Sequence, residues 1–253
     1  MKNRIFLYLF LLLTQSAFAQ SHKVTVEDLF IRYLEIENES MAKMIINSND
    51  SLYSLFCKAA LAKNETEAID LYSEFISLNP KYGLAEAYFN RGVKYNWLEM
   101  AKLSIEDFDK YMEYDNKNPY AYYFRGNSFA VLDEYDKAIK DYSVAIEIEP
   151  TFDLAYLMRG NCYFDKKDYN EALLDYNKTL ILDKKSDQAY IMRGLVYEAT
   201  EEYKKAISDW EKVKDISPEN TEVANKLIER VSEKEIVKTN GRIDRNINNR
   251  TER

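Results

Sequence analysis

Aromatic and small residues recur along this chain with a constant period. Four Arg-Gly pairs stand 34 residues apart, at Arg91-Gly92, Arg125-Gly126, Arg159-Gly160 and Arg193-Gly194. A Tyr precedes each Gly by four residues, and a Tyr or Phe follows it by three. These offsets place the rings on one face of a helix, so each period is predicted to begin with an amphipathic helix.

The second half of each period carries another amphipathic pattern. Ser or Ala follows each Gly by twelve positions and an aromatic residue follows it by sixteen, with Ile or Leu between them. A turn such as Asp133-Glu134-Tyr135 separates the two halves, and Pro150 and Pro218 follow the second. The pattern predicts two helices per period, with Gly at their crossing because a missing side chain lets two backbones approach closely.

This spacing resembles the tetratricopeptide repeat, a helix-turn-helix unit of about 34 residues with aromatic, Gly, Ala and Pro positions in this order. The resemblance covers residues 85–218 and implies an all-α fold, a right-handed α-solenoid of antiparallel helix pairs. Its units span 85–118, 119–152, 153–186 and 187–218. Upstream, residues 49–84 repeat the spacing in degenerate form, with two extra residues and Phe56 at the Gly position.

The segments at both ends of the array are expected to cap it. Residues 20–48 carry apolar residues at helical intervals, namely Val26, Leu29, Tyr33, Met41 and Ile45. Residues 219–234 are predicted to form a helix whose stripe of Val223, Leu227 and Val231 covers the last unit, as an array requires. Residues 235–253 are rich in Asn and Arg and poor in large apolar groups, so we expect a disordered tail.

The first residues have the features of an export signal. Lys2 and Arg4 precede an apolar run, residues 5–13, which is followed by Ala17-Phe18-Ala19. This pattern predicts a signal peptide over residues 1–19, cleaved after Ala19, and hence a periplasmic or extracellular protein. The apolar run is about half of the ~20 residues that a membrane-spanning helix needs, so we expect no stable membrane span after cleavage.

The charge and the cysteine content of the chain argue against nucleic-acid binding and against an internal disulfide. The chain has 35 Lys and Arg against 43 Asp and Glu, a net charge of −8, and removal of residues 1–19 deletes two cations to give 33 − 43 = −10. Such a surface repels nucleic acid. Cys57 and Cys162 fall three units apart, too far for a disulfide, and are interpreted as small buried apolar residues.

The residue types that most catalytic sites need are scarce. His22 is the single His of the sequence, and no HExxH, CxxC or phosphate-binding Gly motif occurs. We therefore expect no enzyme activity, no cofactor and no metal site. A hydrolase that uses two of the 43 acids remains a minor alternative.

A charge pair recurs inside the repeat. The Arg before each Gly lies on the inward stripe of the first helix, and an Asp follows each Gly by fifteen residues on the inward stripe of the second. Because an isolated charge there would be costly, we predict that each Arg pairs with an Asp of its own or a neighbouring unit. Binding of an anionic ligand by these Arg residues is the alternative. The residues concerned are Arg91, Asp107, Arg125, Asp141, Arg159, Asp175, Arg193 and Asp209.

The resemblance implies that the first helices of successive units line a concave groove that holds a protein or peptide partner. Carried over to this chain, the groove contains Phe89, Val93, Asn96, Tyr123, Asn127, Leu157, Asn161, Phe164, Ile191, Leu195 and Glu198. The lining is apolar with a few amides, which suits side-chain pockets and backbone hydrogen bonds. Packing between units is the alternative role, above all for Leu157 and Ile191. A self-associating structural protein is the second hypothesis for the whole chain.

Overall fold

The computed structural model describes residues 30–31, 33–35, 37–48 and 51–251, with side chains described as far as residue 236. Within these residues every regular element is helical. The helices are α3 (Glu39–Ile46), α4 (Ser51–Ala60), α5 (Glu65–Ser77), α6 (Leu84–Trp97), α7 (Ala101–Met112), α8 (Pro119–Val131), α9 (Tyr135–Ile148), α10 (Asp153–Asp165), α11 (Tyr169–Leu182), α12 (Asp187–Ala199), α13 (Tyr203–Ile216), the 3₁₀ helix η1 (Pro218–Asn220) and α14 (Thr221–Thr251).

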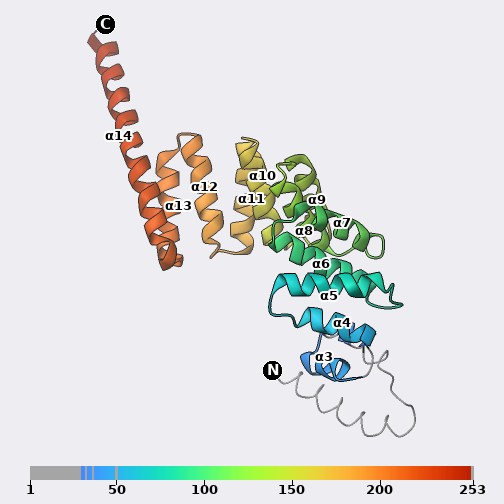
Figure 1. Ribbon diagram of the computed structural model, residues 1–253. Coiled ribbons are helices and arrows are strands. Elements are labelled where there is room, and N and C mark those ends of the chain that lie inside the picture. The colour runs from blue at the N-terminus through green and yellow to red at the C-terminus, as the bar shows by residue number, and fades with distance from the viewer. Residues whose placement is uncertain (1–29, 32, 36, 49–50, 252–253) are drawn as a thin grey trace. The chain divides into compact units, whose positions relative to one another are not determined.

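The chain divides into two compact units between Asn116 and Lys117. The amino-terminal unit contains α3 to α7 and the carboxy-terminal unit contains α8 to α14 (Figure 1). In both units each helix packs against the next one along the chain, and short turns join the paired helices. The expected class, an all-α solenoid of antiparallel helix pairs, is confirmed.

The four glycines of the Arg-Gly pairs occupy equivalent helix crossings. A Cβ added to Gly92 would meet the ring of Phe108, and one added to Gly126 would meet the ring of Tyr142 at 2.8 Å. Gly160 and Gly194 face Tyr176 and Trp210 in the same way. Each ring lies sixteen residues after its Gly and is almost fully buried, so the aromatic side chain fills the space that the missing Cβ leaves.

The degenerate unit, α4 and α5, replaces this crossing by aromatic packing. Phe56 stands at the Gly position and is only 2% exposed. Its ring meets Tyr72 edge to face with centroids 5.2 Å apart, and it meets Phe75 and Phe30 in similar geometry. Edge-to-face contacts of this kind stabilise a core beyond the burial of area, so the helices stay packed without Gly.

The turns between first and second helices share one backbone conformation. Glu99, Asp133, Lys167 and Glu201 all have positive φ, at 57°, 57°, 63° and 58°. Left-handed backbone is uncommon for residues with a Cβ. Its recurrence at one position shows that the repeat geometry imposes it, whatever the side chain.

The carboxyl end differs from the sequence-based expectation in two respects. In α14 the buried face contains Ala224 and Val231, whereas Val223 is 47% exposed, so the predicted stripe was wrong by one residue at its start. The tail expected to be disordered over 235–253 is helical as far as Thr251. Packing against α13 nucleates α14, and extending a nucleated helix adds a hydrogen bond per residue without a new nucleation cost.

Both cysteines are free and buried, as the sequence predicted. Burial raises the pKa of each thiol to about 12, so neither is a reactive thiolate at neutral pH. The predicted signal peptide, His22, Val26 and Leu29 lie outside the described residues. Among the helices of the described part of the chain, none combines the length and apolar character needed to cross a bilayer.

Candidate functional surface

The first helices of the carboxy-terminal unit lie side by side. Backbone contacts join α8 to α10 and α10 to α12, while the second helices α9, α11 and α13 approach one another less closely. When the first helices of a stack lie closer together than the second helices, the stack curves toward the first helices. Helices α8, α10 and α12 therefore form the inner face of this unit, where the sequence placed most of its candidate groove.

Three predicted groove residues on this face form hydrogen bonds within the protein. The hydroxyl of Tyr142 donates to Asn127 Oδ1 at 2.7 Å, and that of Tyr176 donates to Asn161 Oδ1 at 2.9 Å. Tyr123 contacts Asn127, and burial raises its pKa, so its hydroxyl stays protonated. These bonds orient both amides. Asn161 Nδ2 also donates to Met158 Sδ at 3.7 Å, so one of its two N–H groups is engaged within the protein.

Four other groove candidates pack inside the unit or pair with its last helix. Leu157 is 1% exposed, within a cluster that includes Tyr176 and Val196. Ile191 and Leu195 pack against the cluster centred on Trp210. The Glu198 carboxylate forms ion pairs with Arg230 and with Lys234 of α14, the latter at 2.9 Å. These contacts assign Leu157 to the core and Glu198 to the attachment of α14.

The remaining candidates are half-buried. In the carboxy-terminal unit Phe164 packs on Tyr169 with ring centroids 5.9 Å apart. In the amino-terminal unit Phe89 packs against Phe108 and Tyr111, and Val93 and Asn96 lie on the same helix, α6.

Sequence reasoning missed two exposed residues of the inner helices. Tyr120 is 47% exposed and Leu154 is 44% exposed. Each is the second residue of its helix, α8 or α10, and the two stand 34 residues apart. Position in the repeat could have identified them, since both stand at the start of a first helix. The Tyr120 ring also packs on Phe152, with centroids 4.9 Å apart, and is exposed on its other side.

The arginine and aspartate residues pair within each unit of the repeat. Arg159 donates from Nε to Asp175 Oδ2 at 2.9 Å and from Nη2 to Oδ1 at 2.7 Å. The other three pairs, Arg91–Asp107, Arg125–Asp141 and Arg193–Asp209, have the same two-point geometry. The carboxylates are 5–9% exposed and the guanidinium groups 15–20%, so these side chains are occupied by one another.

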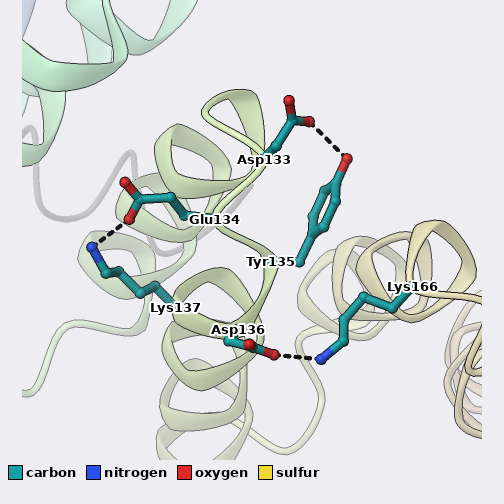
Figure 2. A pocket seen from close by; sticks show the side chains of 6 residues that line it. All are labelled: Asp133, Glu134, Tyr135, Asp136, Lys137 and Lys166. Carbon is teal, nitrogen blue, oxygen red and sulfur yellow. Dashed lines mark hydrogen bonds and ion pairs between the residues drawn. The ribbon is translucent and has the colours of Figure 1, made fainter.

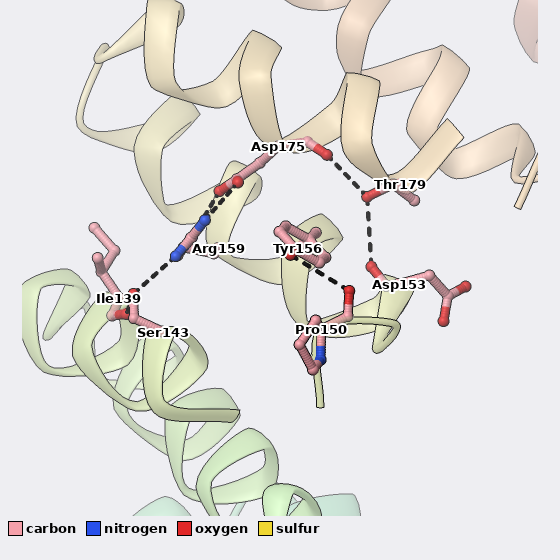
Figure 3. Close-up of polar contacts among 8 residues, drawn as sticks. All are labelled: Ile139, Ser143, Pro150, Asp153, Tyr156, Arg159, Asp175 and Thr179. Carbon is pink, nitrogen blue, oxygen red and sulfur yellow. Dashed lines mark hydrogen bonds and ion pairs between the residues drawn. The ribbon is translucent and has the colours of Figure 1, made fainter. Parts of the chain in front are cut away.

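The remaining nitrogen of the guanidinium group links neighbouring repeats. Arg159 Nη1 donates to Ser143 Oγ at 2.9 Å, which joins α10 to the preceding second helix, α9 (Figure 3). Arg193 reaches Asn177 in the same way. In Figure 3 the network continues through Thr179, whose hydroxyl lies near the carbonyl oxygens of Asp175 and Asp153. Arg91, Arg159 and Arg193 thus each tie their own helix pair together and also tie it to the second helix before it.

At Asp107 and Asp175 the cost of burying the carboxylate outweighs its attraction to the arginine. Desolvation raises the pKa of Asp175 even though Arg159 acts to lower it, and Asp107 shows the same direction. The hydrogen bond to Asp175 raises the pKa of Arg159, so the pair does attract. The attraction therefore offsets only part of the cost of removing a charge from water, as is common for buried ion pairs.

A pocket of about 390 Å³ lies at the turn between α8 and α9, lined by residues 133–137 and Lys166 (Figure 2). Its charges are paired: Asp136 with Lys166, and Glu134 with Lys137. The hydroxyl of Tyr135 donates to Asp133 at 2.8 Å, which raises its pKa to about 12. In the described part of the chain no three His, Cys, Asp or Glu side chains gather as metal ligands.

Stacked helix pairs, four of them with Gly at the crossing, and an inner row of first helices define a helical-repeat protein. Models of the tetratricopeptide repeat match residues 119–152, 154–186 and 187–220. These three segments are therefore tetratricopeptide repeats. No curated protein sequence matches it.

Solved structures share this fold at low sequence identity. The crystal structure of MamA is 22% identical, with a TM-score of 0.59, and the match covers 69% of this chain and 99% of MamA. MamA from Desulfovibrio magneticus RS-1 is 15% identical, with a TM-score of 0.59 over 72% of this chain and 96% of that one. YrrB, described as a TPR protein with an unusual peptide-binding site, is 20% identical, with a TM-score of 0.58 over 83% of this chain and all of YrrB.

Proposed function

We propose that this protein is a non-catalytic scaffold that binds a polypeptide segment along the inner face of its carboxy-terminal unit. The observation that carries the proposal is the exposure of large apolar side chains, Tyr120 and Leu154, at equivalent positions of adjacent first helices. The oriented amides of Asn127 and Asn161 lie on the same two helices. An apolar surface with fixed donors suits a segment held by side-chain contacts and backbone hydrogen bonds.

Two further points support a binding role. The buried arginines of the repeat are engaged by aspartates, so they are not available to an anionic ligand. YrrB has the same fold and a peptide-binding site. The negative charge of the chain favours a partner segment with basic residues.

The test uses peptides selected from a displayed random library against the full mature chain. Combined Tyr120→Ser and Leu154→Ser should weaken the selected peptides at least about tenfold, since truncated interface anchors commonly cost more than ~1 kcal/mol each. Both side chains are already exposed, so we expect the melting temperature to stay close to that of the wild type. Affinity is measured by fluorescence polarisation.

The matched control is Leu174→Ser with Ile181→Ser. These residues are 63% and 69% exposed on α11, a second helix away from the inner row, so the control removes apolar surface without touching the groove. Equal affinities for the groove variant and the wild type, or a loss confined to the α11 variant, would contradict the inner-face assignment.

We further propose that the protein acts after export, in the periplasm or outside the cell. The amino-terminal pattern of Lys2, Arg4, the apolar run and Ala17-Phe18-Ala19 supports this location. Amino-terminal sequencing of the protein from its native host should begin at Gln20. Recovery of a chain that begins at Met1 from the cytoplasm would contradict it.

A further inference from the structure

The turn between α6 and α7 exposes a group of large apolar side chains, here called the Trp97 turn. Trp97 is 57% exposed, Leu98 42%, Met100 45% and Leu103 38%. All four fall within seven consecutive residues of the amino-terminal unit. They lie at the end of a helix pair, outside the surface to which peptide binding is assigned above.

The fold does not need apolar residues at this turn. Glu99 and its three equivalents share a φ of about 60°. The next residue, Met100, has φ −82° and ψ 58°, and its equivalent Asp168 has almost the same angles, −81° and 63°. Neither side chain caps the following helix. The positions of Trp97, Leu98, Met100 and Leu103 are filled by Asp165, Lys166, Asp168 and Glu171 two units later. The same conformation therefore forms with charged residues.

Positive charge flanks the turn. Lys94 Nζ lies 4.2 Å from the centre of the Trp97 ring, and Lys102 begins the first turn of α7. Neither lysine forms an ion pair among the described residues, in contrast to Lys137 in the next such turn, which pairs with Glu134. Against these two cations the turn carries one carboxylate, Glu99.

The neighbouring turn of the same unit exposes one more large apolar side chain. Residues 61–64 join α4 to α5, and Leu61 there is 38% exposed beside Lys63, while Glu65 and Glu67 follow in the first turn of α5. Helices α4, α5, α6 and α7 pack in sequence and reverse direction at each connection, so the turns after α4 and α6 fall at one edge of the unit. That edge thus presents Leu61 in addition to the four side chains of the Trp97 turn.

We propose that the Trp97 turn docks this protein on a lipid bilayer that contains anionic phospholipid. Trp side chains favour the boundary between headgroups and acyl chains, and lysine stems can lie along apolar surface while their ammonium groups reach phosphate. A stable protein–protein interface buries about 800 Å² of surface on each partner. Four side chains on one narrow turn offer less surface than that. An exposed apolar turn flanked by Lys94 and Lys102 fits the surface of an anionic bilayer better.

Fluorescence of the full mature chain tests this directly. The chain has two Trp residues, and Trp210 is fully buried, so an emission change on adding vesicles reports on Trp97. We expect a blue shift and co-sedimentation with vesicles of phosphatidylcholine and phosphatidylglycerol, and weaker binding to phosphatidylcholine alone. Failure of the wild type to co-sediment with the anionic vesicles overturns the proposal.

The discriminating variant copies a turn that this fold already accepts. Trp97→Asp, Leu98→Lys, Met100→Asp and Leu103→Glu together install the residues found at 165, 166, 168 and 171. Vesicle partitioning should fall more than about tenfold, because each apolar side chain removed contributes to burial in the bilayer. The α11 control, Leu174→Ser with Ile181→Ser, should partition like the wild type.

Two results would overturn the proposal even if the wild type binds vesicles. Equal partitioning of the four-residue variant would assign binding to another surface. A concentration-dependent oligomer of the wild type, absent in this variant and unaffected by lipid, would assign the turn to a second copy of the chain. Peptide affinity is measured on the same variant and should be unchanged, so this test and that of the proposed function can fail separately.

Discussion

Replacing Asp175 by Ala is expected to lower the free energy of unfolding by about 3–5 kcal/mol, the loss typical of a buried ion pair from which one partner is removed. Arg159 would keep its largely buried position but lose two charge-assisted hydrogen bonds, at 2.9 and 2.7 Å. The remaining bond to Ser143 leaves Nε and Nη2 without an acceptor that matches their geometry. Urea unfolding followed by circular dichroism measures the change.

The control for this experiment is an exposed ion pair in the same compact unit, the carboxy-terminal one. Asp136 pairs with Lys166, and its side chain is 87% exposed, so Asp136→Ala should cost less than ~1 kcal/mol. A loss of that small size for Asp175→Ala would show that Arg159 recovers its hydration, which would contradict a structural role for the pair.

The double variant Arg159→Met with Asp175→Leu separates the attraction between the two charges from the cost of burying them. Because desolvation outweighs attraction at Asp175, replacing both charges by apolar groups should cost less than removing the carboxylate alone. Such a result would show that this pair aligns its helices more than it adds net stability. The links from the arginines to Ser73, Ser143 and Asn177 extend this alignment from one repeat to the next.

Periodicity alone predicted the helix pairs, the glycine crossings and the pairing of arginine with aspartate. These features depend on spacing within one unit, and the 34-residue period repeats the same contacts each time. The links from arginine to the preceding helix were not predicted, although Ser73, Ser143 and Asn177 each directly follow the large aromatic residue of a second helix. The position recurs, but it is filled by small polar side chains that carry no charge to mark them as partners of an arginine.

The candidate groove was predicted less well because residues at one repeat position have different neighbours. Tyr123, Leu157 and Ile191 are equivalent, yet Leu157 is almost fully buried while the other two are half-buried. Its surroundings include Leu180 of α11, whose equivalents Met112, Ile146 and Lys214 differ from it in size and polarity. Helical spacing locates the inner stripe of a helix, but the depth of each position depends on side chains contributed by other helices.

The Gly194→Ala variant should lose about 1–3 kcal/mol of unfolding free energy through overpacking, despite the better helix propensity of Ala. The added Cβ would lie 2.3 Å from Trp210 Nε1 and 2.7 Å from Cε2, and Trp210 is fully buried. The indole cannot move aside without breaking its hydrogen bond to the carbonyl oxygen of Ile191, which is 3.2 Å away. Thermal unfolding and the emission spectrum of Trp210 both report the change.

Gly92→Ala provides the comparison within the same chain. Its nearest neighbour, the ring of Phe108, lies 3.2 Å from the added Cβ, a distance that a few tenths of an ångström of movement relieves. Here the gain in helix propensity, up to about 1 kcal/mol, should offset most of the crowding. If both variants lost the same stability, the effect would come from the helix backbone and not from the ring that faces it. The expected difference in stability loss between the two variants would show that the aromatic residue sixteen positions after each Gly decides how much space the helix crossing has for a side chain.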